Sequence, residues 1–305
     1  MAPSNPPRMS TYLTGRTSVI TPFDPWRSRL CTCPPKLSLD PYTGCQHGCI
    51  YCYASSYIRD FFRCRPKRGL LDRVRRDLER VRPGALISMS NSSDPYPPME
   101  ARLRLTERCL KMFRGRGLRI LVVTKGTTVL RDVDLLRELG AAVTVSLTTL
   151  DESLCRRLEP GAPPPSERLE ALSKLSQEGV PTGLRLDPII PFLTDDQIEV
   201  VVEEAVSAGV RHVVASTLKP RPDGWARLRE TFPEEWGRMA RLYREGMRVG
   251  PSMYLPARVR RELLERAMKV CLRAGVSFST CREGFPDLNK APTCDGSHMA
   301  GVSKS

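Results

Sequence analysis

Residues 44–54 read Gly44-Cys45-Gln46-His47-Gly48-Cys49-Ile50-Tyr51-Cys52-Tyr53-Ala54. Its cysteines have the spacing CxxxCxxC, with tyrosines on both sides of the last one. Three thiolates on one tight loop can hold three irons of a cubane and leave the fourth iron without a protein ligand, whereas electron-transfer ferredoxins give every iron a thiolate. Because an iron with an open position can bind a substrate or a cofactor, the loop predicts a cluster that takes part in a reaction and does not only carry electrons.

In this loop the chain resembles the radical S-adenosylmethionine (SAM) enzymes, whose defining motif is CxxxCxxC. The resemblance implies that Cys45, Cys49 and Cys52 bind a 4Fe-4S cluster whose open iron chelates SAM. It also implies reductive cleavage of SAM to a 5′-deoxyadenosyl radical, and hence a reducing partner such as ferredoxin or flavodoxin. Zinc or disulfides are the alternatives, but structural zinc usually takes four ligands from paired CxxC units. Neither alternative explains the further matches downstream.

The length and composition fit an intracellular enzyme. A chain of 305 residues can bury the core of one large domain, or of one domain with an appended piece. Residues 1–7 contain no apolar signal core, and no apolar run reaches about 18 residues, so we expect a cytoplasmic protein with no membrane part. In such a chain, 11 cysteines indicate metal or redox use rather than structural disulfides.

The net charge is +14, and it is carried mostly by arginine, since only nine of the 48 basic residues are lysine. The basic residues cluster at 63–68, 73–76, 114–119 and 258–261. A basic field of this size favours salt-dependent binding of a phosphate backbone, so we expect a nucleic acid, RNA or DNA, as substrate or partner. The alternative is biased composition with solvated helix faces.

Residues 37–216 alternate apolar runs with amphipathic stretches, a pattern that predicts a parallel sheet with outer helices. We therefore predict an α/β fold, a partial (β/α)6 TIM barrel, which the resemblance implies is of the radical SAM type. The expected strands are 36–41, 85–89, 118–123, 141–147, 180–186 and 210–215. The expected helices are 54–63, 101–114, 130–139, 165–178 and 194–208, the last one capped by Thr194-Asp195-Asp196.

Three regions are predicted along the chain. Residues 1–36 form an N-terminal extension with a CxC motif, residues 37–216 form the barrel, and residues 217–305 form a mainly helical C-terminal extension with a cysteine-containing tail. Residues 219–224 read as a linker to helices at 225–248 and 257–274. Trp225, Trp236 and Tyr243 in this region either dock a helix or stack on a base.

Short polar motifs follow the predicted strands, and in such a barrel chemistry collects at the carboxyl ends of strands. They are 91–96, 124–126, 146–152 and 185–188. With Leu158-Glu159-Pro160-Gly161 and Arg168-Leu169, they make the chain similar to the spore photoproduct lyase-like branch of radical SAM proteins. The similarity implies that Ser93, Lys125 and Ser146 contact SAM, with Tyr51 and Tyr53 as catalytic residues beside the cluster. Arg185 is a further cofactor-binding candidate, together with Asp187 and Glu100; the alternative is that the strand-end Arg185 and Asp187 pair with each other.

One position departs from that branch. Spore photoproduct lyases carry a hydrogen-donating cysteine just before the Ser-Asp pair, where this chain has Asn91. An amide does not readily donate a hydrogen atom, so this difference at position 91 favours a different radical reaction. Its expected substrate is a nucleic acid or, as the alternative, a peptide or protein. The competing class is a non-catalytic nucleic-acid-binding protein with an iron–sulfur or zinc site.

The remaining cysteines divide by context. Cys31 and Cys33 precede the barrel, while Cys281 and Cys294 lie in a Pro- and Gly-rich tail that makes a poor apolar core. Four thiolates from distant loops form a closed site, so we expect an auxiliary 4Fe-4S cluster, with zinc or unligated cysteines as alternatives and Cys64 as a substitute ligand. The other three, Cys109, Cys155 and Cys271, read as small buried hydrophobes.

Overall fold

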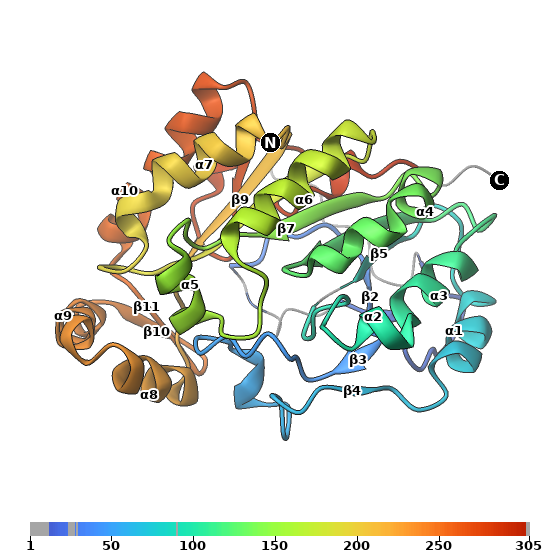
Figure 1. The fold of residues 1–305 in the computed structure, drawn as a ribbon, viewed down its shortest axis with the longest axis horizontal. Coiled ribbons are helices and arrows are strands. Elements are labelled where there is room, and N and C mark those ends of the chain that lie inside the picture. Colours follow the sequence, from blue (N-terminus) through green and yellow to red (C-terminus); the bar gives the residue numbers. More distant parts are fainter. Residues whose placement is uncertain (1–11, 24–27, 29, 90, 303–305) are drawn as a thin grey trace.

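The computed structural model describes residues 12–23, 28, 30–89 and 91–302, which form a central sheet with helices packed outside it (Figure 1). Eight strands make the sheet in the order β1-β2-β5-β6-β7-β8-β9-β12. Their bounds are Thr21–Pro22, Leu37–Leu39, Leu86–Met89, Arg119–Thr124, Ala142–Ser146, Thr182–Ile189, His212–Thr217 and Ser277–Thr280. All neighbours pair in parallel except β1 with β2, and β1 and β12 form the edges. The predicted partial barrel is confirmed.

All six expected strands are present because their apolar runs are buried on both faces. Every residue of β5, β7 and β9 is buried, as expected for strands of a covered parallel sheet. The last strand, β12, was not predicted, since Phe278 is its only large apolar residue. The sheet thus continues beyond residue 216, while the domain boundaries stay a prediction.

Ten α-helices occur in the described residues. Around the sheet lie α1 (Leu70–Leu78), α2 (Glu100–Leu103), α3 (Leu105–Met112), α4 (Val133–Glu138), α5 (Glu152–Leu158), α6 (Pro165–Gln177), α7 (Ile198–Ser207) and α10 (Ala257–Arg273). The remaining two, α8 (Pro222–Thr231) and α9 (Pro233–Arg244), pack together at one corner of the molecule (Figure 1). None of the described helices combines the length and the apolar character needed to cross a membrane. The helices expected at 165–178 and 257–274 are confirmed. The stretch expected at 225–248 is helical but is divided at Phe232 into α8 and α9, and its last two residues lie in a strand instead.

The helix expected at 54–63 is wrong. Only the short 3-10 helix η2 (Ala54–Ser56) forms there, because the chain turns back at Asp60, which has a φ of 52°, and the Phe61 carbonyl accepts a hydrogen bond of 2.9 Å from the Cys45 amide. Two short strands, β3 (Tyr42–Thr43) and β4 (Arg65–Pro66), pair on either side of this segment. The returning chain therefore closes the cysteine loop instead of continuing as a helix.

Three other local predictions need correction. The expected helix 101–114 is divided at Arg104, where φ is 50°, because the buried Glu100 carboxylate accepts the Thr106 amide at 3.0 Å and so caps α3. At 194–196, Thr194 is the N-cap position of the short 3-10 helix η4 (Asp195–Gln197), which leads into α7 at Ile198. The expected side-chain cap is wrong, because Thr194 and Asp195 accept amides of the preceding turn instead. Residues 219–224 are not a free linker, because α8 begins inside them.

The C-terminal tail fills the amino-terminal end of the barrel. Arg119, the first residue of β6, donates to the carbonyls of Ser297 at 2.7 Å and Ala300 at 3.3 Å. Inside the sheet, Ala300 packs in a small cluster with Leu86, Leu121 and Ala142. The tail is therefore part of the core, and the carboxyl ends of the strands form the accessible end of the barrel.

Two of the remaining elements, β10 (Met247–Val249) and β11 (Ser252–Tyr254), form a hairpin between α9 and α10. Next to it, Trp225 lies 5.8 Å from Trp236 and 5.1 Å from Tyr243 between ring centroids, and all three pack on the main core. The Tyr243 hydroxyl donates to the Leu218 carbonyl at 2.6 Å. These aromatic side chains dock helices, which was one of the two predicted roles.

Candidate active site

A cavity of about 590 Å³ lies within the barrel, and it gathers the side chains that the sequence singled out. Its lining includes Cys45, Cys49, Cys52, Tyr51, Tyr53, Ser93, Lys125, Ser146, Arg185 and Asp187, together with Cys31, Cys33, Cys281 and Cys294. Two candidates do not line it: Cys64 and Glu100. Glu100 instead contacts Tyr42 and pairs with Arg131 at 2.7 Å, so its role is structural.

The cysteine loop is held in place by close backbone contacts. Gly44 has a φ of 78°, and a β-carbon there would lie 2.3 Å from the Phe61 carbonyl oxygen. A β-carbon at Gly161 would lie 2.1 Å from the Gln46 carbonyl oxygen, and the Gly161 amide donates to His47 at 2.9 Å. Only glycine fits at these two positions, because the chain approaches too closely for any side chain.

A network of buried charges centred on Glu159 lies beside the cysteine loop and holds it in place. Glu159 pairs with Arg168 at 2.6 Å, and both side chains are 1% exposed. Glu159 also lies 3.7 Å from the Lys125 ammonium and accepts hydrogen bonds from Thr148 at 2.7 Å and from Tyr51. Burial would raise the pKa of Glu159, but the charges of Lys125 and Arg168 and the two hydroxyl donors lower it to about 2. The carboxylate is therefore ionised and fixes Tyr51 and Lys125 beside the loop.

The two predicted catalytic tyrosines are held differently. Tyr51 is bound by Glu159, whereas the Tyr53 hydroxyl donates to the Asn91 carbonyl at 2.8 Å. The Asn91 amide side chain donates to the Ser38 hydroxyl at 2.6 Å and to the Ser88 carbonyl at 3.0 Å. Asn91 therefore ties neighbouring strand ends together, and its contacts keep Tyr53 oriented beside the cavity.

Asp94 links the polar motif after β5, to which it belongs, with the motif at the end of β6. It accepts hydrogen bonds from the Thr124 hydroxyl at 2.6 Å and from the Lys125 amide at 2.7 Å, and the His47 ring lies 3.2 Å away. Despite burial, the pKa of Asp94 is lowered by His47 and these donors. His47 also contacts the Gly161 carbonyl at 3.2 Å. His47 therefore stabilises the turn.

Arg185 lies at the level of Ser146 because the two are paired residues on β8 and β7. The prediction that Arg185 ends its strand is wrong, since β8 continues to Ile189 with an irregular register to β9. Arg185 pairs with Asp187 at 2.9 Å, as one sequence reading allowed, and its Nη2 lies 3.3 Å from the Cys281 Sγ. It therefore lies against Cys281 in the lining of the cavity that the CxxxCxxC cysteines also line.

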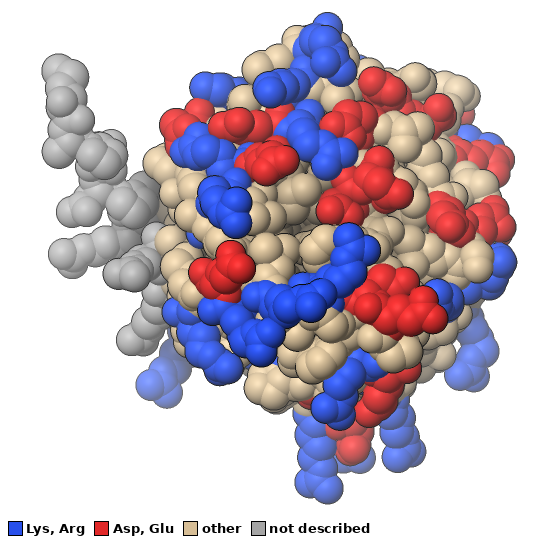
Figure 2. All heavy atoms as spheres, turned by 90° about the vertical axis from the view of Figure 1, so that its left-hand side faces the viewer, with Lys and Arg blue, Asp and Glu red and all other residues tan. Residues whose placement is uncertain are grey.

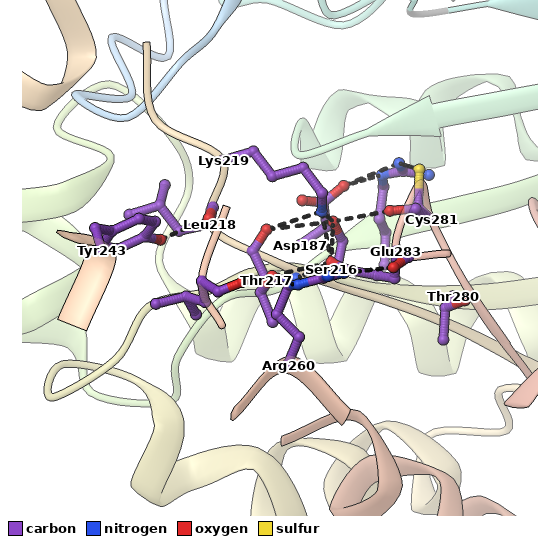
Figure 3. Close-up of polar contacts among 12 residues, drawn as sticks. Asp187, Ser216, Thr217, Leu218, Lys219, Tyr243, Arg260, Thr280, Cys281 and Glu283 are labelled. Atoms are coloured by element: carbon purple, nitrogen blue, oxygen red, sulfur yellow. Dashed lines mark hydrogen bonds and ion pairs between the residues drawn. The ribbon is translucent and has the colours of Figure 1, made fainter. Parts of the chain in front are cut away.

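A second buried network, shown in Figure 3, anchors the loop after β12. Glu283 accepts hydrogen bonds from the Thr217 amide at 2.7 Å and from Lys219 at 2.5 Å, and it pairs with Arg260 at 3.1 Å. The sequence did not reveal this carboxylate, because its partners lie 23 to 66 residues away. The network holds the adjacent Cys281 against the cavity.

The four other cysteines also lie close together. The Cys294 thiol contacts the Cys33 Sγ at 3.4 Å. The pKa of Cys294 is raised by its hydrogen bond with Cys33, by burial and, to a smaller extent, by the charge of Cys281. The pKa of Cys31 is raised chiefly by its hydrogen bond with Cys33. No group of three His, Cys, Asp or Glu side chains in the described residues is already placed to hold a metal ion.

Many surface arginines form ion pairs. Figure 2 shows the face over α7, α9 and α10, where basic and acidic side chains alternate. Arg266 pairs with Glu199 at 2.6 Å and so joins α10 to α7. In the 258–261 cluster, Arg258, Arg260 and Arg261 pair with Glu245, Glu283 and Asp287. This cluster therefore contributes less to an anion-binding field than its charge alone suggests.

Comparison with known proteins agrees with this arrangement. A family model described as the radical SAM superfamily matches residues 39–205. An uncharacterised protein of Mycobacterium tuberculosis is 28% identical over 254 residues, which cover 76% of this chain and 73% of the relative. A radical SAM Nalpha-GlyT isomerase of Pseudomonas phage M6 is 26% identical, over 80% of this chain and 53% of the phage protein.

Solved structures of spore photoproduct lyase share the fold. A mutant with bound AdoMet and dinucleoside spore photoproduct superposes with a TM-score of 0.64 at 17% identity, over 80% of this chain and 75% of the other. A second mutant reaches a TM-score of 0.65, also at 17% identity, over 87% and 79% of the two chains. At this identity the likeness concerns the fold alone.

Proposed function

The chain belongs to the radical SAM superfamily, and we propose that Cys45, Cys49 and Cys52 bind the 4Fe-4S cluster at which this radical SAM enzyme cleaves SAM. The donor set suits the cluster, because the three thiols line one cavity and leave the fourth iron without a protein ligand. When bound, the cluster and SAM supply a 5′-deoxyadenosyl radical that abstracts hydrogen from a C–H bond. The convergence of the three thiols with Ser93, Lys125 and Ser146 carries this proposal.

The chain's own residues bind and orient SAM. The hydroxyls of Ser93 and Ser146 suit ribose hydroxyls and the amino acid end, and the Lys125 ammonium suits the carboxylate. Lys125 lies 3.7 Å from Glu159, beyond close hydrogen-bond range, so its ammonium can donate to a ligand while Glu159 keeps it charged. Arg185 completes the set from β8, at the level of Ser146.

Aromatic and basic side chains in and beside the cavity support a nucleic acid base or sugar as substrate, with Tyr53 and Arg282 in its lining and Arg221 next to Tyr53. The guanidinium carbons of Arg221 and Arg282 lie 6.0 Å and 5.8 Å from the Tyr53 ring centroid. Aromatic rings stack on bases, and arginines beside them attract phosphates. The spore photoproduct lyases of the same fold include a complex with a dinucleoside.

The reaction differs from photoproduct reversal. With Asn91 in place of a hydrogen-donating thiol, and with its amide engaged by Ser38 and Ser88, the product radical must be resolved in another way. Tyr51 and Tyr53 are the proposed catalytic residues, because both line the cavity and their hydroxyls are held by fixed partners. A ferredoxin or flavodoxin partner and a cytoplasmic location stay predictions.

The test is SAM turnover by anaerobically reconstituted protein with dithionite as reductant. We expect 5′-deoxyadenosine from the unaltered protein and from Cys64→Ala, whose thiol lies outside the cavity lining, but none from Cys45→Ala. Equal product from the unaltered protein and Cys45→Ala would refute the proposal. The substrate is sought by mass spectrometry of tRNA, rRNA and protein from cells lacking the gene, where a lost modification only in protein would refute the nucleic acid assignment.

A further inference from the structure

Of the eight cysteines outside the CxxxCxxC loop, four line the cavity, and three of these four lie at the two open edges of the sheet. Cys31 and Cys33 lie in the connection from β1 to β2 at one edge, and Cys281 directly follows β12 at the other. Cys294 belongs to the tail that fills the barrel. Although Cys33 and Cys294 are 261 residues apart, their sulfur atoms are separated by only 3.4 Å.

A buried ion pair holds these two segments together. Lys36 pairs with Asp295 at 2.5 Å, and both side chains are 5% exposed. Lys36 stands three residues after Cys33 and directly before β2, while Asp295 follows Cys294. On the other side, the His212 ring on β9 contacts the Cys294 carbonyl at 3.4 Å. Cys33 and Cys294 are thus brought together by contacts on both flanks, which do not depend on a bond between the sulfurs.

Cys281 is held at the same cavity by its own anchors. Its amide donates to the Ala215 carbonyl at 3.0 Å, and the adjacent Glu283 is fixed by Thr217, Lys219 and Arg260, as Figure 3 shows. Arg185 lies 3.3 Å from the Cys281 sulfur. The cationic side chains of Arg185 and Lys36 offset the negative charge that several thiolates would gather in a buried place.

We propose that Cys31, Cys33, Cys281 and Cys294 form a closed four-thiolate metal site that joins the two edges of the open barrel. The 3.4 Å separation of Cys33 and Cys294 is too long for a disulfide, whose sulfurs lie about 2.05 Å apart. It is close to the roughly 3.8 Å that tetrahedral geometry places between thiolates 2.3 Å from one zinc ion. In a cubane each thiolate binds a different iron, so this pair would have to separate further.

A closed site has no open coordination position and so differs in kind from the CxxxCxxC loop. Four protein thiolates satisfy either one zinc ion or all four irons of a cubane. In both cases the gain is structural, because binding couples the tail to the edge strands and adds its free energy to folding. Because no three ligands yet surround one point in the described residues, binding requires the side chains of both Cys31 and Cys281 to rotate toward the pair.

The test uses full-length protein purified anaerobically and lacking the first site, Cys45→Ala/Cys49→Ala/Cys52→Ala. We expect it to retain about one zinc, or about four irons with matching sulfide, per chain. Adding Cys31→Ala/Cys33→Ala should remove that metal, whereas adding Cys64→Ala as the matched control should not. The metal content of these variants does not depend on SAM cleavage. The experiment can therefore refute this proposal without refuting the proposed function, and the reverse.

Two outcomes overturn the proposal: a first-site variant without metal, and metal that survives Cys31→Ala/Cys33→Ala. If the double variant does not fold by circular dichroism, X-ray absorption on the first-site variant decides instead. Only sulfur neighbours at about 2.3 Å around zinc, or around iron with the iron–iron distances of a cubane, support the site. Nitrogen or oxygen neighbours from the protein refute it.

Discussion

The Glu159 carboxylate lies 2.6 Å from the Arg168 guanidinium, and neither side chain is more than 1% exposed. This pair stands between the cysteine loop and α6, since Glu159 also binds Tyr51 and Arg168 donates to the Ser146 carbonyl at 3.1 Å. Removing one member of a buried pair leaves the other charge uncompensated, which is far more costly than losing a surface pair.

Glu159→Gln should therefore lower the free energy of unfolding by about 3–5 kcal/mol. Its matched control is Glu178→Gln, which breaks the 2.9 Å pair with Arg137, where the side chains are 48% and 53% exposed. The control should cost about 0–1 kcal/mol. Denaturant unfolding of the two variants measures the difference, and equal losses would show that the Glu159 network contributes no more than a surface pair.

The same carboxylate predicts a pH dependence. Its pKa is lowered from 4.5 to about 2 in the folded protein, so the unfolded chain binds more protons between these values. The stability that Glu159 contributes is fully present above pH 4.5 and is lost as the pH falls toward 2. The gap in unfolding free energy between the unaltered protein and Glu159→Gln, both without metal, should shrink from pH 5 to pH 3. A constant gap would contradict the lowered pKa.

Lys125→Met should weaken SAM binding about 10-fold to 100-fold, because a charge-assisted hydrogen bond to the carboxylate is worth about 1.5–3 kcal/mol. The iron content should not change, since Lys125 is not a cluster ligand. The control Lys174→Met removes an exposed ammonium paired with Glu170 on α6 and should leave SAM affinity unaltered. Equilibrium titration with SAM measures both, and unchanged affinity of Lys125→Met would remove this residue from the site.

Gly161→Ala should distort the cysteine loop and reduce bound iron, because the new methyl group would lie 2.1 Å from the Gln46 carbonyl oxygen. Gly237→Ala, within α9 and with no atom within 4 Å of the added carbon, is the control and should stabilise the protein by up to about 1 kcal/mol. Iron counts after anaerobic reconstitution and thermal unfolding compare them. Full iron in Gly161→Ala would mean that the loop relaxes without loss of the site.

Nucleic acid binding should weaken with salt, and Arg282→Ala should reduce the slope of log affinity against log salt by about 1 if Arg282 contacts a phosphate. Arg114→Ala removes an arginine that pairs with Glu138 at 2.6 Å on the surface and serves as the control, with little expected change. Fluorescence anisotropy with single-stranded RNA and DNA measures the slopes. A salt-independent affinity would rule out phosphate contacts.

Much of the barrel follows from local patterns. Apolar runs such as 141–147 specify strands because a strand covered on both faces needs apolar side chains in every position. Prediction from the sequence failed at 54–63, where a backbone hydrogen bond between Cys45 and Phe61 forms in place of a helix. It also missed β12, because one large apolar residue is too weak a pattern to predict a strand.

The CxxxCxxC loop was enough to predict the family, and with it the cofactor that the family implies, while the motifs after each strand predicted which side chains would line the same cavity. What holds these side chains in place follows from the tertiary structure, since the buried Glu283 pairs with Lys219, 64 residues away. The Glu159–Arg168 pair is local in the chain, but Glu159 also contacts the more distant Lys125 and Tyr51. The meeting of Cys33 with Cys294 is likewise a product of folding. Sequence spacing is enough to identify metal ligands that lie on one short loop. Side chains that are far apart in the sequence come together only through the packing of the whole fold, which local patterns do not show.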